Sequence, residues 1–490
     1  MTSRPKRARK PARARSRTAD FDTFAGARIR HYCQGIGDCH LLRFTGEGGR
    51  HIFVLIDCGV HSMVTGGPSK MRAIVDDIAS VTDRIDVLVV THEHWDHVSG
   101  FLDAAEQFGR LTIDTVWMAW TEDPGDPLAD ELDTYRGMAM TALQDAAMQL
   151  ERSREAGPYM AGLRDGLQAL LGFQFGAKGE KVRAARNAAA ALGRSGVPTY
   201  LGPEMPPLSI PGAPNLRVYV LGPPRDKAAL GLEVKSGEMY GLLGRAGWQI
   251  SAGLRNLHAI SAGAQSADPA QPFDDAVGTR LSDVLAGAAE NEIATFVREH
   301  YVGGDDRSSQ DWRRIDADWL AGGAELALRL DRGINNTSLV LAFEFVDSGR
   351  VLLFPGDAQA GNWLSWEKVA WSVDGSTITA DDLLSRTIYL KVAHHGSHNA
   401  MLKAKGLERM RSPDLAAFIP VNEVDAKKAR WHEMPFLPIL DALGERAGAR
   451  VIRADDPWIG NDAADPPFET PSGAVRALRR GGLWVELDIA

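Results

Sequence analysis

Short runs of apolar residues recur along the chain, and most of them end at a glycine, a proline or a charged residue. Runs of about four to eight apolar and β-branched residues between turn residues are typical of strands. Closely spaced strands mixed with helical patterns, such as the one at 100–108, indicate an α/β or α+β core built on a sheet. The predicted strands are 27–32, 39–44, 51–57, 85–90, 112–118, 216–221, 337–345, 350–354, 387–392, 415–420, 450–453 and 483–487.

Two long segments between these strands follow a different pattern. After Pro127, which suits a first helical turn, apolar residues recur every three or four positions, as one face of a helix requires. Further helices are predicted at about 160–171 and 181–192, before a stretch rich in proline and glycine. We therefore expect a mostly helical insertion at about 125–214 and a second insertion, with mixed helical signals, at about 225–333.

Composition places the 490-residue chain among ordinary globular proteins, with 44% hydrophobic and 24% charged residues. No apolar run approaches the roughly 18 residues of a membrane span, and the N-terminus lacks the apolar core of a secretion signal. Three cysteines do not make a disulfide framework in so long a chain, and they fit a reducing compartment. We therefore expect a cytoplasmic protein without membrane contact.

Charge is distributed unevenly along the chain. The net charge is −9, yet the first 17 residues carry eight lysines and arginines and no acid, so the rest is more acidic than the total suggests. Such a tail is most often a disordered, solvated arm, and its charge also suits electrostatic contact with nucleic acid. The sequence therefore predicts a basic disordered tail at 1–24, followed by one large domain at 25–490 that contains both insertions.

A cluster of histidines and acids follows the predicted strand at 85–90. His92, His94, Asp96 and His97 lie within six consecutive positions. Imidazole nitrogens and carboxylate oxygens are the usual protein ligands of zinc, and they also suit manganese and iron. A polar loop that happens to be rich in histidine is the alternative, but it leaves matching motifs elsewhere in the chain without a reason.

The His-x-His-x-Asp-His spacing resembles that of the metallo-β-lactamase fold family. The resemblance implies an α/β fold, namely an αββα sandwich, here enlarged by the two mostly helical insertions. It also implies two divalent metal ions, Zn²⁺ or Mn²⁺. In that arrangement His92 and His94 hold the first metal, and Asp96 and His97 hold the second.

Three other motifs continue the resemblance, each at the end of a predicted strand. Asp57 matches the family's aspartate that orients a ligating histidine through a hydrogen bond. Asp357 matches the carboxylate that bridges both metals. In the adjacent pair His394 and His395, the glycine that follows favours His395 as a ligand of the second metal. His394 then faces the substrate, shares the metal, or packs as an ordinary hydrogen-bonded histidine.

A narrower resemblance indicates the ComEC-like branch of this family, which is named after the hydrolase-like domain of a DNA-uptake channel. The matching segments are 34–38, 335–340 and 394–397, and we expect a stand-alone relative without the channel. The chain departs from the wider family because the usual third histidine of the first metal is missing. Asn336 is the expected replacement ligand, and an amide oxygen makes manganese or magnesium suitable beside zinc.

Two such metals imply hydrolysis, with a metal-bound hydroxide as the nucleophile. Asp96 can position that hydroxide, and His394 or His398 can protonate the leaving group. Paired metals suit in-line displacement at phosphorus, so the resemblance favours a phosphodiesterase or nuclease acting on DNA or another nucleic acid. A hydrolase of a small ester, a lactone or a phosphorylated head group is the first alternative. A non-catalytic interaction subunit on the same fold is the second.

Signals for substrate or partner binding are weaker. Lys427, Lys428 and Arg430 lie beside Trp431, and cations next to an aromatic ring can bind phosphates and stack a base. The simpler interpretation is a solvated helix end. The acidic body of the chain argues against a nuclease, because nucleic-acid binders usually show basic faces. The insertions offer a surface for a protein partner or a cover for the site.

Overall fold

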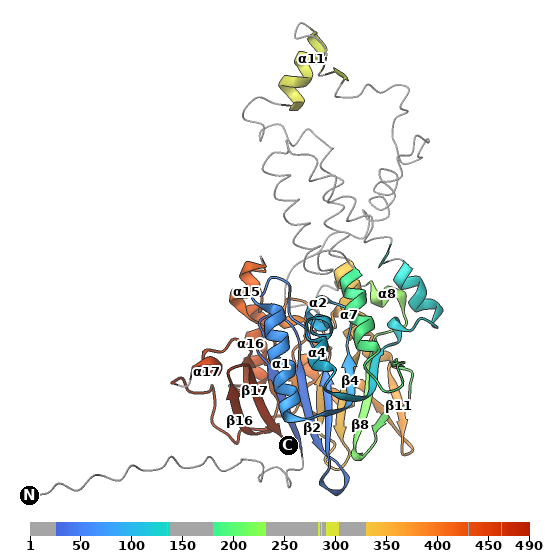
Figure 1. Cartoon of the computed structure of the whole chain (residues 1–490), viewed down its shortest axis with the longest axis vertical. Coiled ribbons are helices and arrows are strands. Elements are labelled where there is room, and N and C mark those ends of the chain that lie inside the picture. Colours follow the sequence, from blue (N-terminus) through green and yellow to red (C-terminus); the bar gives the residue numbers. More distant parts are fainter. Residues whose placement is uncertain are drawn as a thin grey trace, which may run out of the picture.

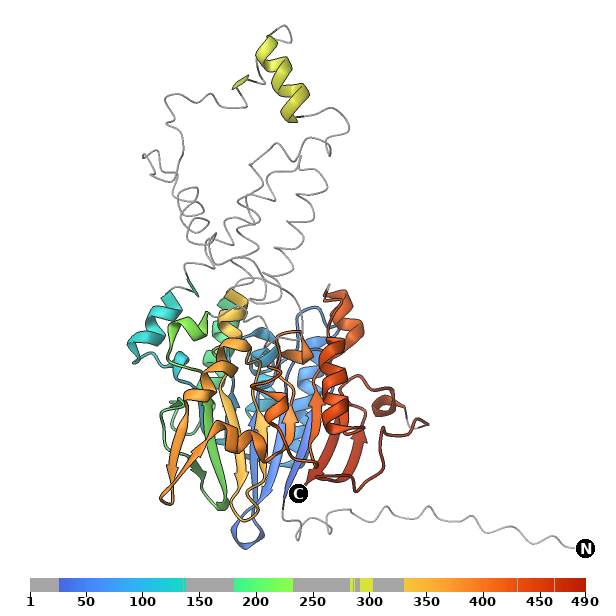
Figure 2. The ribbon, with the colours of Figure 1, turned by 180° about the vertical axis from the view of Figure 1, so that it is seen from behind.

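Two large sheets form the centre of the protein, and helices lie on either side of them (Figure 1, Figure 2). The computed structural model describes residues 26–134, 136–137, 180–231, 283–284, 286, 291–302, 330–429, 431–461 and 463–490. The basic tail and large parts of both insertions lie outside these residues. The described chain has a mixed α/β fold, as the sequence predicts.

The first sheet contains both ends of the described chain. Its strand order is β16-β17-β1-β2-β3-β4-β5-β6, in which the pairs from β3 to β6 are parallel and the others antiparallel. Its strands are β1 (Ala27–Tyr32), β2 (His40–Thr45), β3 (His51–Ile56), β4 (Arg84–Val90), β5 (Thr112–Ala119), β6 (Thr199–Leu201), β16 (Val475–Gly481) and β17 (Trp484–Ile489).

The second sheet is formed by the C-terminal half of the chain together with two strands that follow the first insertion. Its order is β15-β14-β13-β10-β9-β8-β7, and the pairs from β10 to β15 are parallel. Its strands are β7 (Leu208–Ile210), β8 (Ala213–Gly222), β9 (Val340–Phe345), β10 (Val351–Phe354), β13 (Thr387–Lys391), β14 (Ala416–Ile419) and β15 (Val451–Arg453). A separate hairpin pairs β11 (Ala370–Val373) with β12 (Ser376–Thr379).

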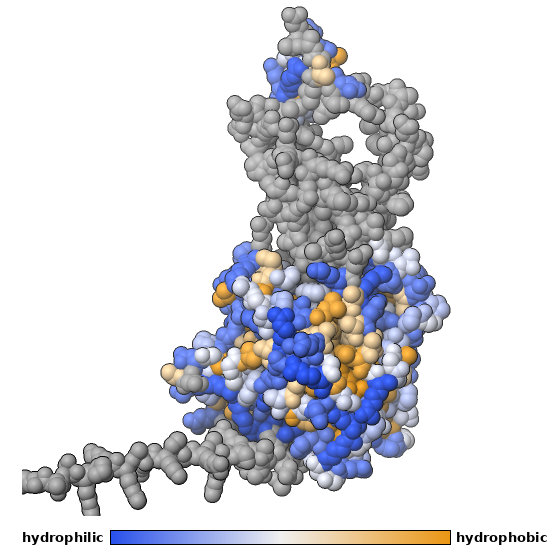
Figure 3. Space-filling model, viewed as in Figure 1, coloured by the Kyte–Doolittle hydropathy of each residue, from blue (hydrophilic) through white to orange (hydrophobic). Residues whose placement is uncertain are grey.

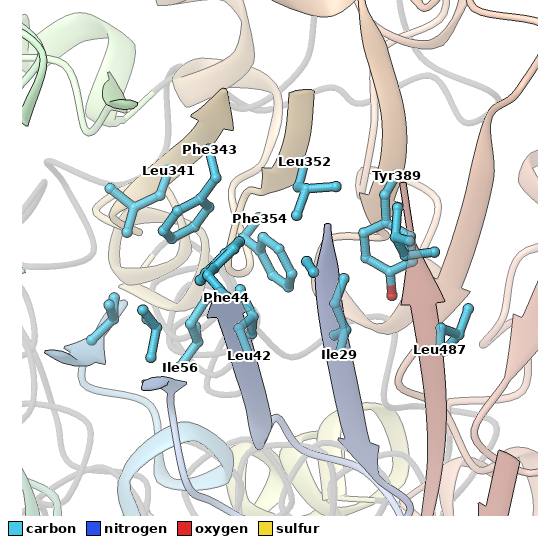
Figure 4. Packing of buried hydrophobic residues seen from close by; sticks show 14 of the residues in the cluster. Ile29, Leu42, Phe44, Ile56, Leu341, Phe343, Leu352, Phe354, Tyr389 and Leu487 are labelled. Atoms are coloured by element: carbon cyan, nitrogen blue, oxygen red, sulfur yellow. The ribbon is translucent and has the colours of Figure 1, made fainter. Parts of the chain in front are cut away.

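An apolar core fills the space between the two sheets (Figure 4). Leu42 and Phe44 of the first sheet belong to this core together with Phe343 and Phe354 of the second. Alternate residues of each strand face opposite sides of its sheet, so Ala342 points away from this core and packs among the helices. Full burial of a large apolar side chain contributes about 1.5–3 kcal/mol, and this core therefore holds the two sheets face to face.

Helices cover the outer face of each sheet. Those that pack on the first sheet are α1 (Gly67–Val81), α3 (Gly100–Asp103), α4 (Ala105–Phe108) and α7 (Glu180–Ala190). Those that pack on the second sheet are α13 (Ala360–Ser365), α14 (Ala380–Ser385) and α16 (Leu437–Ala447). Further described helices include α2 (Trp95–Val98), α8 (Lys227–Leu230), α11 (Glu292–Val297), α15 (Glu423–Lys428) and α17 (Pro457–Gly460). None of the described helices has both the length and the apolar character needed to cross a bilayer.

The structure changes the expected limits of the first insertion. β6 and β7 lie within the segment that was expected to close it, and they are edge strands of the first and second sheets. Each has three residues, too few to show a period of two in the sequence. The insertion proper is therefore shorter at its C-terminal end than 125–214, and α7, predicted at 181–192, packs directly on the first sheet.

Candidate metal centre

The candidate site lies where the carboxyl ends of parallel strands from both sheets meet. β3 is followed by Asp57 and β4 by the histidine cluster, whereas β10 and β13 of the second sheet are followed by Asp357 and by the pair at 394–395. Asp57 and both histidines of that pair have positive φ angles, of 54°, 42° and 51°. Non-glycine residues adopt such angles at some cost, and they often do so at functional sites.

Four of the predicted ligands come together in one buried group. The donor atoms of Asp96, His97, Asp357 and His395 all lie within 4.8 Å of one another. His395 Nε2 is 2.9 Å from Asp96 Oδ2 and 3.3 Å from Asp357 Oδ2, and His97 Nε2 is 3.2 Å from the same Asp357 oxygen. The first sheet supplies two of these residues and the second sheet the other two. His395, rather than His394, is the member of this group.

Hydrogen bonds on the side away from the group determine which ring nitrogen of His97 and of His395 faces it. Asp57 Oδ2 accepts a hydrogen bond from Nδ1 of His97 at 2.8 Å, and the carbonyl of Pro420 accepts one from Nδ1 of His395 at 2.8 Å. Asp57 also accepts from the backbone amide and hydroxyl of Thr91. Each ring therefore presents Nε2 to the centre, and Asp57 has the orienting role that the sequence predicts.

His92 and His94 form a second pair of nitrogen donors next to this group. Nε2 of His92 lies 3.0 Å from Nδ1 of His94. The Nδ1 atom of His92 is 3.0 Å from the hydroxyl of Thr91, and Nε2 of His94 is 3.6 Å from a carboxylate oxygen of Asp331. Two nitrogens that each lie about 2.1 Å from one cation can be separated by such a distance. The pair is therefore arranged as ligands of a single ion.

A buried lysine, which the sequence analysis did not identify, completes the site. Nζ of Lys391 forms an ion pair with Asp38 and lies 3.2 Å from Oδ1 of Asp357, and all three side chains are buried. The same Asp357 oxygen accepts a hydrogen bond from the backbone amide of His394 at 3.0 Å. Oδ1 of Asp357 is therefore engaged, and Oδ2 is the oxygen that faces the ligand group. Lysine gave no signal in the sequence because it ends an otherwise ordinary apolar strand.

The chemistry of the donor set fits a divalent cation. Asp38, Asp57, Asp96 and Asp357 are buried around the site, and in the metal-free chain Lys391 and the protonated rings of His97 and His395 supply the positive charge beside them. Buried charges without compensation are costly, and a bound cation would supply that charge in place of the two imidazole protons. Nε2 of His97 and Oδ1 of Asp96 also have no hydrogen-bond partner among the described residues. Buried His and Asp groups can thus hold a metal ion here.

Burial lowers the pKa of all four candidate ligand histidines, and at two of them the charge of nearby carboxylates outweighs it. Burial alone would lower the pKa of His395, but the carboxylates of Asp357 and Asp96 raise it to about 10. Burial opposes the same effect at His97, whose pKa nevertheless lies well above the usual value because acids surround it. Burial and the neighbouring rings lower the pKa of His92 well below its usual value, and burial lowers the pKa of His94 to about 3.

The loop between His92 and His94 is held by a cluster of buried ion pairs that sequence reasoning missed. Glu93 pairs with Arg136 at 3.2 Å and with Arg186 of α7 at 3.1 Å, and Arg186 also pairs with Glu122 at 2.7 Å. Arg136 further donates a hydrogen bond to the hydroxyl of Thr337 at 2.9 Å. We call these four charged residues the Glu93 cluster. It connects the described ends of the first insertion to the ligand loop.

The replacement ligand expected at Asn336 is wrong. Its amide oxygen accepts a hydrogen bond from the backbone amide of Asn362 at 3.1 Å, and its amide nitrogen donates to the carbonyl of Leu230 at 3.2 Å. Asn362 donates back to the carbonyl of Asn336 at 3.0 Å. Asn336 therefore joins α8 to α13 through hydrogen bonds, and its amide oxygen is already engaged by a backbone amide.

The other candidate residues have different surroundings. Burial lowers the pKa of His394 to about 4, and its Nδ1 lies 2.5 Å from the hydroxyl of Ser397. Lys427 pairs with Glu423 at 2.7 Å and Lys428 with Asp425 at 2.8 Å, both within α15. These i,i+4 and i,i+3 pairs fit the simpler interpretation of a solvated helix end.

Two further candidates complete the set. His398 is partly buried beside Phe436, with ring centroids 6.3 Å apart. Arg430 lies outside the described residues.

Comparisons with known proteins do not extend this description. No family model matches the chain, and a search of curated proteins gives no match either. The interpretation of the site therefore rests on its own residues and their geometry.

Proposed function

We propose that the chain is a metal-dependent hydrolase built on a metallo-β-lactamase-type αββα sandwich, with a centre for two divalent cations. The observation that carries this proposal is the buried group of Asp96, His97, Asp357 and His395, contributed by both sheets. The layer order of helices, two sheets and helices supports the fold assignment. A decayed, non-catalytic relative would be expected to have lost some of these ligands.

The chain's residues have distinct roles in the proposed reaction. Divalent cations, when bound, supply Lewis-acid activation of water and of the bond to be cut. Asp96 has one oxygen beside His395 and a second oxygen, Oδ1, without a hydrogen-bond partner among the described residues. That second oxygen can accept a hydrogen bond from the attacking water and orient it. His394, a candidate for protonating the leaving group, is half-buried beside Asp357. The hydroxyl of Ser397 contacts its Nδ1 atom, so Nε2 is the nitrogen on the other side of the ring.

A phosphodiester, as in DNA or another nucleic acid, is the proposed substrate class. Paired cations suit in-line displacement at phosphorus because they stabilise both the attacking and the leaving oxygen. The resemblance of segments 34–38, 335–340 and 394–397 to the ComEC-like branch supports the same class. The face of the described body seen in Figure 3 is largely hydrophilic, with apolar areas near α7. A small ester, lactone or phosphorylated head group is the alternative substrate.

Cleavage assays with added metal test this proposal. The full chain is incubated with single- and double-stranded DNA in Mn²⁺, Mg²⁺ or Zn²⁺, beside Asp357→Ala and a control, Asp76→Ala, on an exposed part of α1. We expect metal-dependent cleavage that Asp357→Ala lowers at least about 100-fold, because a lost ligand removes several kcal/mol of transition-state stabilisation. The control should cleave normally. Metal-loaded protein that leaves DNA intact but hydrolyses small phosphodiesters or esters would establish the alternative substrate.

A further inference from the structure

The loop before β9 borders both parts of the candidate centre. The backbone amide of Leu339 donates to the carbonyl of Thr91 at 2.8 Å, directly before the histidine cluster. The hydroxyl of Ser338 accepts from the backbone amide of Asp357 at 3.1 Å. Two hydrogen bonds therefore fix this loop between the start of the first ligand segment and the shared carboxylate.

Asn335, the last residue of the helical turn that leads into this loop, differs from Asn336 in its contacts. Its side chain is fully buried, and its amide nitrogen lies 3.4 Å from Nε2 of His394. Its amide oxygen, Oδ1, has no hydrogen-bond partner among the described residues. A buried carbonyl-type acceptor that is left unsatisfied is energetically costly, so this oxygen calls for a hydrogen-bond donor or a cation beside it.

The His92–His94 pair needs a further donor atom, whereas Oδ1 of Asn335 is a donor atom without an occupant. It offers two nitrogens to one ion, whereas catalytic sites of this kind usually have three protein ligands. Asp357 can contribute Oδ2 at most, because Lys391 and the His394 amide engage its other oxygen. The pair therefore needs a further protein donor, and the loop before β9 is hydrogen-bonded to the residue that precedes it.

We propose that Oδ1 of Asn335 is a protein ligand of the cation held by His92 and His94, in place of the histidine that this position usually has. The inference rests on the proposed metal centre and adds its missing ligand. The two sites are then unequal: one has two carboxylates and two imidazoles, and the other has two imidazoles and a neutral amide oxygen. Oxygen donors favour Mn²⁺ and Mg²⁺ relative to a site made of imidazoles, so the weaker site should accept Mn²⁺ readily.

Titration with MnCl₂ alone tests the proposal without any substrate. Metal-free full chain is titrated while the six-line electron paramagnetic resonance signal of free Mn²⁺ is measured, so that bound ions are counted directly. The variants are Asn335→Leu, which removes the oxygen at similar volume, and Asn335→Asp, which replaces it with a charged oxygen. Thermal unfolding in EDTA shows whether each variant is folded.

The expected result is two Mn²⁺ per wild-type chain, with one tight and one weaker site. Asn335→Leu should weaken the second site at least ten-fold and leave the first unchanged, whereas Asn335→Asp should bind the second ion at least as tightly as wild type. A merely structural asparagine predicts the reverse order, since a buried charge is worse tolerated than leucine. If Asn335→Leu does not fold, Asn335→Asp alone decides, and weaker binding by it overturns the proposal.

The outcomes separate this inference from the proposed function. Two ions bound by wild type and unchanged affinities in both variants would overturn the assignment of Asn335 and leave the hydrolase proposal intact. A single ion in wild type would overturn both the assignment of Asn335 and the two-cation centre, and it would leave a hydrolase with one metal. A wild-type chain that takes up neither Mn²⁺ nor Zn²⁺ would overturn the metal-dependent function itself.

Discussion

Lys391 has a charged side chain, yet only 1% of that side chain is exposed to solvent. It lies between two carboxylates, Asp38 and Asp357, and it also donates to the carbonyl of Gly356 at 2.9 Å. A buried cation with three acceptors fixes the carboxylate it contacts, and here that carboxylate is a candidate metal ligand. Lys391 therefore positions Asp357, and it supplies part of the positive charge that four buried acids need.

Replacing this lysine should destabilise the metal-free protein more than the metal-loaded one. Lys391→Met leaves two buried carboxylates without their cation, and breaking such a pair costs about 3–5 kcal/mol. Added Mn²⁺ should restore part of this loss, because the ion neutralises Asp357 directly. Chemical denaturation with and without metal measures both quantities.

Lys405→Met is a suitable control because its pair with Glu367, at 2.6 Å, is partly exposed. Exposed pairs contribute about 0–1 kcal/mol, so this variant should remain near wild-type stability in both conditions. Equal losses in the two variants would contradict the role assigned to Lys391.

Sequence reasoning at the residue scale succeeded where ligands are close together in sequence. His92, His94, Asp96 and His97 form one short motif, and the structure places them around one centre. It cannot distinguish Asn335 from Asn336, because these neighbours differ only in the direction that each side chain takes. Adjacent identical side chains carry no signal for which one faces a ligand, and Lys391 acquires its role only through packing.

At the scale of elements, the ligand loop depends on helices that flank the first insertion. The Glu93 cluster joins the residue between the two leading histidines to α7 and to Arg136. Arg136 also donates to the hydroxyl of Thr337, in the loop that follows Asn335. A displacement of these helices would therefore be transmitted to both sides of the His92–His94 pair.

Removal of one arginine should expose this dependence. Arg136→Met leaves Glu93 with Arg186 as its remaining partner in the cluster, and we expect a loss of about 3 kcal/mol in the free energy of unfolding. The loss should be accompanied by weaker binding of the second Mn²⁺, measured by the same titration. Glu93→Gln combined with Arg136→Met removes both charges and should recover part of the stability. A destabilised variant with unchanged metal affinities would separate the cluster from the site.

Strands were easier to predict than helices in this chain. β1 was predicted with the bounds that the structure has, because a run between turn residues has clear ends. The helix predicted at 100–108 is two short helices, α3 and α4, that meet at Ala104. α1 was missed although its buried residues, among them Met71, Ile74 and Ile78, have helical spacing. The strand pairing of β6 and β7 depends on contacts with distant segments, which local patterns do not contain.

At the scale of the molecule, a metal ion bound at this centre would link the two sheets. Asp96 and His97 follow a strand of the first sheet, whereas Asp357 and His395 follow strands of the second. Binding energy at such a point contributes to the stability of the whole sandwich, since the unfolded chain does not bring these donors together.

Removal of metal should therefore lower the unfolding temperature. A site saturated at 100 times its dissociation constant adds about 2.7 kcal/mol to the free energy of unfolding. The effect should increase from pH 6 to pH 8, because His395, with a pKa of about 10 in the metal-free chain, must release its proton to bind the ion. Thermal unfolding with Mn²⁺ or EDTA at several pH values measures this.

Asp96→Asn should abolish most of the metal-dependent gain in stability. A gain that is the same at every pH would show that the raised histidine pKa values play no part in metal binding.

A link between the sheets through a bound metal ion would also affect how this chain tolerates insertions and deletions over evolution. Both insertions lie in sequence between Asp96 and Asp357, so a bound ion closes the long loop that contains them. The entropic cost of closing a flexible loop increases with the logarithm of its length, so doubling the length adds only about 0.6 kcal/mol to the free energy of closure. Relatives can therefore lengthen, shorten or exchange these segments at little thermodynamic cost to the centre. New specificities can then arise in the insertions while the four ligands stay fixed.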